Sequence, residues 1–147
     1  IKEIQKVLND FNIKKPQLII AGVNPHAGEN GTIGNEENLI IKPVIKKLNK
    51  NNIDITGPHS ADSIINKKNK KKYDVFIFNY HDQALIPFKI ISNNTGINYT
   101  GGLDVIRVSP DHGTAYDIVG KKLANTSSIL NCFKFIKKVS KNRSLNC

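Results

Sequence analysis

The sequence has 147 residues, of which 39% are hydrophobic, and it carries a formal net charge of +10. This length suits one domain, since a compact chain of about 150 residues buries roughly 70% of its unfolded surface. No apolar stretch approaches the roughly 20 residues of a membrane span, and the first residues lack the apolar core of a signal peptide. We therefore expect a cytoplasmic globular protein.

The methionine and cysteine counts lead to two further expectations. The sequence contains no methionine, so it does not begin at its own initiator residue, and we expect a processed chain or a fragment. Its two cysteines, Cys132 and Cys147, do not have the spacing of a zinc site, and such thiols usually stay reduced inside cells.

The positive charge allows a nucleic-acid hypothesis, because clustered lysines displace counterions from a phosphate backbone. The densest run, residues 67–72, contains five lysines and one asparagine but no aromatic side chain on which bases could stack. The other lysines are spread along a chain that is also rich in Asn and Ile, which favours a solvated helix end for this run. A basic nucleic-acid-binding module remains an alternative function.

Apolar periodicity predicts helices and strands that alternate along the chain. The predicted helices cover residues 1–11, residues 35–48 with a boundary or kink at Pro43, a segment from residue 60 into the lysine run, and residues 83–91, 115–119 and 127–138. The predicted strands cover residues 17–23, 53–56, 73–80, 97–100 and 105–109. This alternation indicates a layered α/β fold with a largely parallel sheet, whose ligands gather beyond the carboxyl ends of the strands.

A glycine-rich loop follows the first predicted strand. The apolar run ends at an Asn-Pro turn, which leads into His26 and a loop that contains Gly28, Gly31 and Gly34. The glycines would let main-chain N–H groups approach an anion, and the histidine could bind a metal or move a proton. The spacing is not the Gly-x-Gly-x-x-Gly of dinucleotide-binding folds.

His81 follows another predicted strand, as His26 does. A parallel sheet would bring both to one edge, where neutral imidazoles suit a divalent metal such as Zn²⁺. A histidine after a strand is often only a hydrogen-bonded turn residue, and no local motif supplies a third ligand. His59, which has no predicted strand directly before it, is interpreted as a surface residue.

Four charged side chains are further candidates for chemistry. Asp62 and Asp82 could orient a substrate or transfer its proton, or they could simply cap helices. Lys89 and Arg107 could neutralise a substrate phosphate, although most lysines in so basic a chain are solvent-exposed. Residues 111–114, Asp-His-Gly-Thr, are equally compatible with a helix-start turn and with a functional turn.

Together these residues resemble the 4-hydroxythreonine-4-phosphate dehydrogenases of vitamin B6 biosynthesis. The motifs that carry the resemblance lie in family order between about residues 17 and 122: Gly22-Val23-Asn24-Pro25-His26-Ala27-Gly28-Glu29, Gly34-Asn35-Glu36-Glu37, Gly57-Pro58, Ala61-Asp62, Tyr80-His81-Asp82-Gln83, Arg107-Val108-Ser109 and Asp111-His112-Gly113-Thr114-Ala115.

This resemblance implies an incomplete layered α/β/α fold like that of isocitrate and isopropylmalate dehydrogenases. The chain would be the C-terminal part of a longer two-domain dehydrogenase, with the site-bearing region at about residues 17–122 and C-terminal helices at about 123–141.

The same resemblance implies an enzyme that oxidises and decarboxylates 4-phosphooxy-L-threonine to 3-amino-2-oxopropyl phosphate. The implied cofactors are NAD, or NADP, and a divalent metal such as zinc, magnesium or cobalt. A related oxidative decarboxylase of another phosphorylated hydroxy acid is an alternative. The isolated chain would be inactive, because part of the site lies outside it.

The resemblance also implies roles for individual residues. His26 and His81 match two of the three histidines that bind the family's metal, and the third belongs to a segment upstream of residue 1. Family members are homodimers that share the metal between subunits, so the two histidines can belong to different sites. The remaining matches are substrate-binding positions at Lys89, Asn98 and Arg107, and acidic catalytic positions at Asp62 and Asp82. The residues that contact NAD are not assigned.

Overall fold

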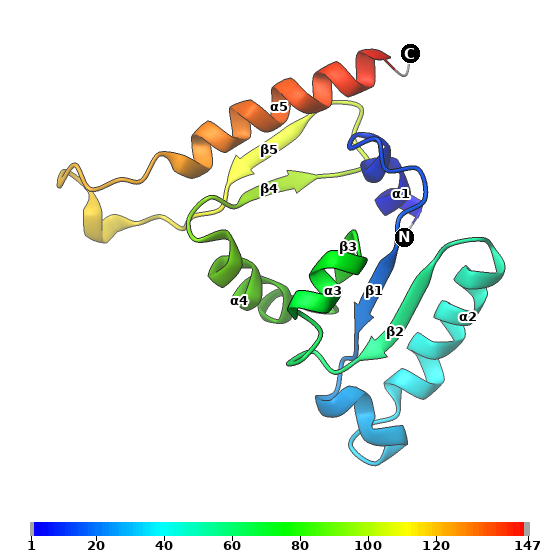
Figure 1. Cartoon of the computed structure of the whole chain (residues 1–147). Helices are drawn as coiled ribbons and strands as arrows, with labels where there is room; N and C mark the ends of the chain where they lie inside the picture. Colours follow the sequence, from blue (N-terminus) through cyan, green and yellow to red (C-terminus); the bar gives the residue numbers. More distant parts are fainter. Residues whose placement is uncertain (1, 146–147) are drawn as a thin grey trace. The chain divides into compact units, whose positions relative to one another are not determined.

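The computed structural model describes residues 2–145 of the chain. These residues form two compact units. The central unit is Lys15–Pro87, and the terminal unit combines the residues before Lys15 with those from Phe88 onward. Each unit has secondary structure of its own (Figure 1).

The central unit is built on a parallel sheet of three strands in the order β2-β1-β3 (Figure 1). The strands are β1 (Leu18–Ala21), β2 (Ile55–His59) and β3 (Val75–Ile77). The middle strand, β1, is almost wholly buried, which is why its sequence is continuously apolar instead of alternating. The parallel sheet predicted from the sequence is therefore confirmed for this unit.

Four of the five predicted strands have different bounds in the structure, and the ends of β2 and β3 have a clear cause. β2 continues to His59 because the Gly22 N–H donates to the His59 carbonyl at 2.8 Å and extends the ladder. β3 ends at Ile77, since the Asn79 side-chain amide donates to the Ala21 carbonyl at 2.7 Å where a further strand residue would have bonded. Hydrogen bonds between distant segments thus set both boundaries.

The helix after the glycine-rich loop begins with a wider turn. A π-helical turn, η2 (Glu37–Ile41), continues directly into α2 (Lys42–Lys50). Pro43 lies at the start of α2, directly after the π-helical turn, so the helix changes its hydrogen-bond pattern where the boundary or kink was expected. Ile41 and Ile45 are buried, and α2 packs against β2.

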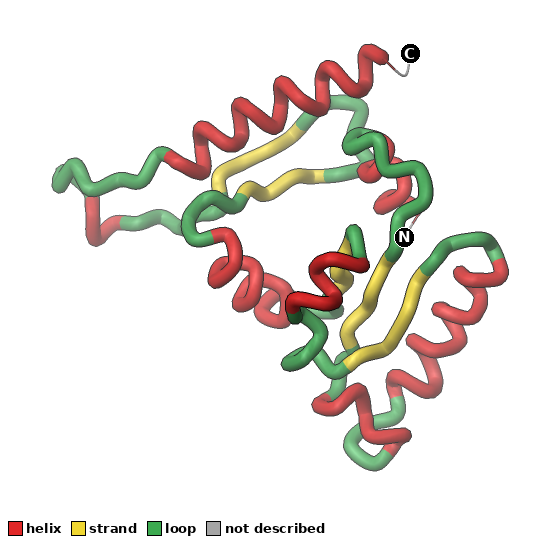
Figure 2. Tube along the Cα trace, viewed as in Figure 1, coloured by secondary structure: helices red, strands yellow, loops and turns green. Residues whose placement is uncertain are grey.

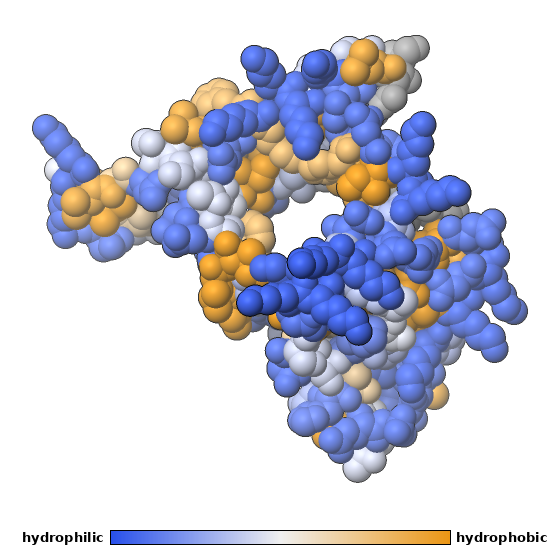
Figure 3. All heavy atoms as spheres, viewed as in Figure 1, coloured by the Kyte–Doolittle hydropathy of each residue, from blue (hydrophilic) through white to orange (hydrophobic). Residues whose placement is uncertain are grey.

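The helix predicted from residue 60 is wrong, because residues 61–66 form turns and bends. Ile64 is 1% exposed and packs into a cluster with Ile19 and Ala21, which draws this segment into the core. The helix, α3 (Lys67–Lys72), starts only after Asn66, whose side chain accepts a hydrogen bond from the Asn69 N–H at 2.9 Å. The lysine run is therefore helical and solvated, and hydrophilic side chains gather over it in Figure 3.

The terminal unit pairs two strands in antiparallel fashion (Figure 2). They are β4 (Ile97–Thr100) and β5 (Arg107–Pro110). The sequence prediction of a largely parallel sheet does not extend to this pair, because the connection over residues 101–106 is too short for a parallel crossover. α4 (His81–Ser92) precedes β4, and the 3₁₀ turn η3 (Tyr116–Ile118) is all that forms where a helix over 115–119 was predicted.

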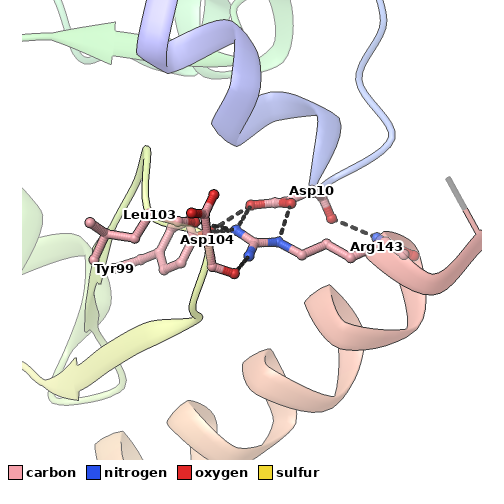
Figure 4. Close-up of polar contacts among 6 residues, drawn as sticks. Asp10, Tyr99, Leu103, Asp104 and Arg143 are labelled. Carbon is pink, nitrogen blue, oxygen red and sulfur yellow. Dashed lines mark hydrogen bonds and ion pairs between the residues drawn. The ribbon is translucent and has the colours of Figure 1, made fainter. Parts of the chain in front are cut away.

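In the terminal unit, the turn after α1 (Lys2–Asn9) contacts the last turns of α5 (Ser127–Leu145). α1 lies near the end of α5, which is longer than predicted and packs on β4 and β5. Arg143 Nε donates to Asp10 Oδ1 at 2.9 Å, and Tyr99 donates its hydroxyl to Asp10 Oδ2 at 2.5 Å (Figure 4). The guanidinium also reaches the carbonyls of Leu103 and Asp104.

Two further sequence expectations concern cysteines and membranes. Cys132 lies in α5, within the predicted helix; its side chain is buried, which raises the pKa of the thiol. Cys147 lies outside the described residues. Within residues 2–145, none of the helices combines the length and apolarity that crossing a membrane requires.

Candidate functional site

The loop that carries His26 has an unusual backbone. After β1 the chain enters a 3₁₀ turn, η1 (Pro25–Gly31), in which the five residues from His26 to Asn30 all have positive φ angles. Four of them are not glycine, with φ between 40° and 57°. The left-handed region costs an L-residue roughly 1 to 2 kcal/mol, so such a run persists only where surrounding contacts enforce it.

The buried side chain of Glu37, which is 1% exposed, contacts the residues just before this run. Its Oε1 atom accepts hydrogen bonds from the backbone N–H groups of Val23 and Asn24 at 2.7 and 2.8 Å. Its Oε2 atom accepts a hydrogen bond from the Asn24 side-chain amide at 2.9 Å. Main-chain N–H groups of this loop thus do approach an anion, and that anion is the protein's own carboxylate.

The glycines of the loop make room for this contact. A Cβ atom at Gly28 would lie 2.6 Å from Glu37 Oε2, and one at Gly22 would lie 3.0 Å from Glu37 Oε1. A Cβ at Gly34 would collide with the Asn24 side chain. Two of the three glycines singled out in the sequence, Gly28 and Gly34, are therefore explained by packing around Glu37 and Asn24.

The carboxylate stays charged in this environment. Burial raises the pKa of Glu37, but the hydrogen bonds from Asn24 and from the Val23 N–H outweigh that effect, and the pKa lies below its ordinary value. The hydrogen bond from Asn24 likewise lowers the pKa of the exposed Glu36.

His81 lies at the start of α4, immediately after the strand β3 and its short connection. Gln83 ties this connection to β1: its side-chain amide donates to the Gly22 carbonyl at 2.7 Å, and its Oε1 accepts from the Asn79 N–H at 2.9 Å. Since β1 and β3 are parallel neighbours, His26 and His81 both follow the same edge of the sheet.

Both imidazoles are exposed and have a carboxylate beside Nδ1. The distance from His81 Nδ1 to Asp82 Oδ1 is 2.8 Å, and that from His26 Nδ1 to Glu29 Oε1 is 3.5 Å. A carboxylate at one ring nitrogen is the usual partner of a metal-binding histidine, because it fixes the ring and leaves the other nitrogen for the ion. Within residues 2–145, however, no group of three or more His, Cys, Asp or Glu residues is arranged to hold a metal.

The other candidates of the central unit differ in their setting. Asp82 lies in the first turn of α4 beside His81. Asp62 is exposed in the turn between β2 and α3, and since no helix begins there, it does not cap one. His59 is exposed, as the sequence suggested, but it ends β2, contrary to the prediction of no strand directly before it.

The three predicted substrate-binding residues belong to the terminal unit and are all exposed. Asn98 pairs with Ser109 and Thr100 with Arg107, which places Asn98 and Arg107 on the same face of the antiparallel pair. Arg107 Nη1 donates to Thr100 Oγ1 at 2.7 Å. Lys89 Nζ lies 3.9 Å from the mostly buried Asp111 carboxylate.

A family model described as pyridoxal phosphate biosynthetic protein PdxA matches residues 1–136. The chain belongs to the PdxA family. A 4-hydroxythreonine-4-phosphate dehydrogenase of Zymomonas mobilis is 47% identical over 127 residues, which are 86% of this chain and 38% of that relative. One of a Sulfurihydrogenibium species is 49% identical over 120 residues, 82% of this chain and 37% of the relative. The chain thus spans about two fifths of such relatives.

Solved structures agree with this membership. The crystal structure of 4-hydroxythreonine-4-phosphate dehydrogenase from Klebsiella pneumoniae matches 94% of this chain and 42% of its own, with a TM-score of 0.79 and 34% identity. The fold is therefore the isocitrate/isopropylmalate dehydrogenase-like α/β fold of these enzymes. A terephthalate 1,2-cis-dihydrodiol dehydrogenase from Burkholderia xenovorans also matches 94% of this chain and 42% of its own, with a TM-score of 0.67 and 30% identity.

Sequence reasoning missed the residues that hold the His26 and His81 segments in place. In the sequence, Glu37 and Gln83 stood out only as members of the family motifs. A buried carboxylate or amide has no local sequence signature when its partners are distant: those of Glu37 are 13 and 14 residues away, and the Gly22 carbonyl is 61 residues away from Gln83.

Proposed function

We propose that this chain is part of an enzyme that oxidises 4-phosphooxy-L-threonine with NAD or NADP and releases CO₂, giving 3-amino-2-oxopropyl phosphate and the reduced nucleotide. Membership of the PdxA family carries this proposal, since the family's relatives are dehydrogenases of that name. The hydroxyl-bearing carbon gives a hydride to the nucleotide and the hydroxyl oxygen loses its proton. The resulting β-keto acid then loses CO₂, and the enolate that remains takes up a proton at carbon.

His26 and His81 are the proposed metal ligands in this chain. Their position after neighbouring parallel strands and the carboxylates at their Nδ1 atoms support the assignment. A bound divalent ion would supply Lewis acidity at the reacting oxygen. Because the described residues offer no third ligand beside them, the proposed site also uses ligands from elsewhere in the enzyme, which we propose to be a homodimer.

Lys89, Asn98 and Arg107 are the proposed substrate-binding residues. An ammonium group and a guanidinium group match a phosphate dianion in charge, and the guanidinium fork donates two parallel hydrogen bonds. Asn98 and Arg107 lie on one face of the β4-β5 pair, where both can donate to the same ligand. Asp62 and Asp82 are the proposed acid–base groups, and both are exposed enough to exchange protons with solvent.

A chimaera tests the proposal directly. This chain replaces the matching segment of the Zymomonas mobilis relative, and NAD reduction by 4-phosphooxy-threonine is measured together with metal content. We expect the chimaera to turn over, and His26→Ala or His81→Ala to lower kcat/KM by roughly 100-fold or more while metal content falls.

The matched control is His59→Ala, since His59 is an exposed histidine at a strand end of the same sheet. It should retain activity and metal. Unchanged turnover and metal content in His81→Ala would refute the ligand assignment. The isolated 147-residue chain should show no turnover, and measurable activity from it would contradict a site completed by other segments.

One observation favours a second candidate. The similarity to a terephthalate dihydrodiol dehydrogenase shows that this fold also occurs in enzymes named for a different substrate. Under this alternative the chimaera would oxidise another hydroxy acid or a diol. Profiling it with phosphorylated and unphosphorylated substrates separates the two, because loss of Arg107 should matter only for a phosphorylated one.

A further inference from the structure

The side chain of Glu37 has no part in the proposed chemistry, although it is among the most deeply buried side chains of the described chain. It lies at the start of η2 and bonds to Val23 and Asn24, which immediately precede the left-handed turn. Both carboxylate oxygens are used, one by the two backbone N–H groups and the other by the Asn24 side chain.

The position of these bonds determines the path of the loop. Asn24 is in extended conformation, with φ −87° and ψ 157°, and the chain then reverses its handedness within two residues to φ 53° at His26. Glu37 fixes the backbone on the N-terminal side of this reversal, while Gly28 packs against its Oε2 atom in the middle of the turn. The carboxylate therefore contacts the loop on both sides of His26.

We infer that Glu37 is a positioning residue for His26: it holds the left-handed turn that presents the imidazole at the sheet edge. The contacts above support the claim that Glu37 holds the turn. The expected effect on metal binding rests on the proposed function of His26 as a metal ligand. Loss of the carboxylate would let residues 26–30 return to right-handed or extended conformations, which would move the imidazole away from its present position.

The test uses NMR to compare Glu37→Gln with the unmodified sequence in the chimaera described above, because the chimaera supplies the further metal ligands that residues 2–145 do not provide. Backbone ¹³C shifts of residues 26–30 report positive φ, and a Zn²⁺ titration followed on the His26 ring signals reports affinity at that side chain. We expect Glu37→Gln to lose the positive-φ shifts and to weaken Zn²⁺ binding at His26 about tenfold, the range typical of residues that support metal ligands.

Two further variants distinguish positioning from general stabilisation. Asp54→Asn removes an exposed carboxylate of the same unit and should change neither signal. The triple variant Asn24→Asp, Glu36→Gln, Glu37→Gln reverses donor and acceptor in each side-chain contact of this cluster, so it should restore the turn and the affinity. Normal shifts and affinity in folded Glu37→Gln would overturn the inference, as would failure of the triple variant to restore them.

If Glu37→Gln does not fold, Asn24→Ala takes its place. It keeps both backbone N–H bonds to Glu37 and removes the two side-chain bonds of Asn24, to Glu36 and to Glu37. We therefore expect a smaller change in the same signals, and no change would overturn the inference. If the unmodified chimaera shows no Zn²⁺ response at His26, the metal-binding proposal fails, while the ¹³C shifts still decide whether Glu37 holds the turn.

Discussion

At the scale of single residues, the strongest charge contact of the terminal unit joins Asp10 and Arg143. The hydrogen bond from Arg143 holds the pKa of Asp10 below its ordinary value of 3.8 despite the opposing effect of burial. Burial and the bond to Asp10 raise the pKa of the Tyr99 hydroxyl, which keeps it a donor at neutral pH. This cluster ties the turn after α1 to the last turns of α5.

Replacing Arg143 by Met should lower the free energy of unfolding by roughly 3 kcal/mol, because it leaves the Asp10 carboxylate buried with little compensation. Urea unfolding followed by circular dichroism measures this. Arg107→Met, which removes an exposed arginine of the same unit, should cost far less. Equal effects of the two substitutions would contradict a special role for the pair.

The same pair predicts a pH dependence. Since the folded pKa of Asp10 lies below its unfolded value, its contribution to stability is present above pH 3.8 and is lost as pH falls through the folded pKa. As pH falls through this acid range, the free energy of unfolding should therefore decrease more steeply for the unmodified chain than for Arg143→Met. A pH profile that the substitution leaves unchanged would show that Asp10 does not titrate this way.

At the scale of secondary-structure elements, the segments that carry both histidines are fixed by side chains and not by the strands alone. Glu37 links the start of η2 to the end of β1, and Gln83 links the first turn of α4 to the same strand end. Both are buried polar side chains with satisfied hydrogen bonds. Each of the two histidine-bearing segments is therefore held to the end of β1 by one buried polar side chain.

Gln83→Leu should lower the free energy of unfolding by about 2 kcal/mol, because it leaves the buried Gly22 carbonyl without its donor. The substitution should also speed hydrogen exchange of the Asn79 N–H, which donates to Gln83 in the unmodified chain. Gln83→Glu retains that acceptor, so it should leave the Asn79 amide protected. Equal exchange rates in the two variants would show that this bond does not hold the connection.

At the scale of the whole molecule, the net charge of +10 is the property most open to a different functional interpretation. The lysine run forms the short helix α3, with its lysine side chains exposed. No aromatic side chain interrupts the run, so it lacks the stacking surface of a single-strand-binding protein.

We therefore expect only weak binding to DNA or RNA, lost at about 200 mM salt, as for non-specific charge contacts. Fluorescence anisotropy with a labelled oligonucleotide over a salt series measures this binding. Substitution of Lys70, Lys71 and Lys72 by Ala should weaken it without abolishing it, because the other positive charges remain. Sequence-selective affinity that persists above this salt range would support the nucleic-acid-binding module instead.

Local pattern in the sequence was sufficient to predict the α/β class, the buried strand before His26 and the family, because apolar runs and motif spacing are properties of neighbouring residues. It could not predict the end of β2 at His59, the core position of Ile64 or the antiparallel β4-β5 pair. Each of these depends on partners distant in sequence or on the length of a connection. The left-handed turn at His26 belongs with them: its glycines were visible in the sequence, but only the fold brings the Glu37 carboxylate among them.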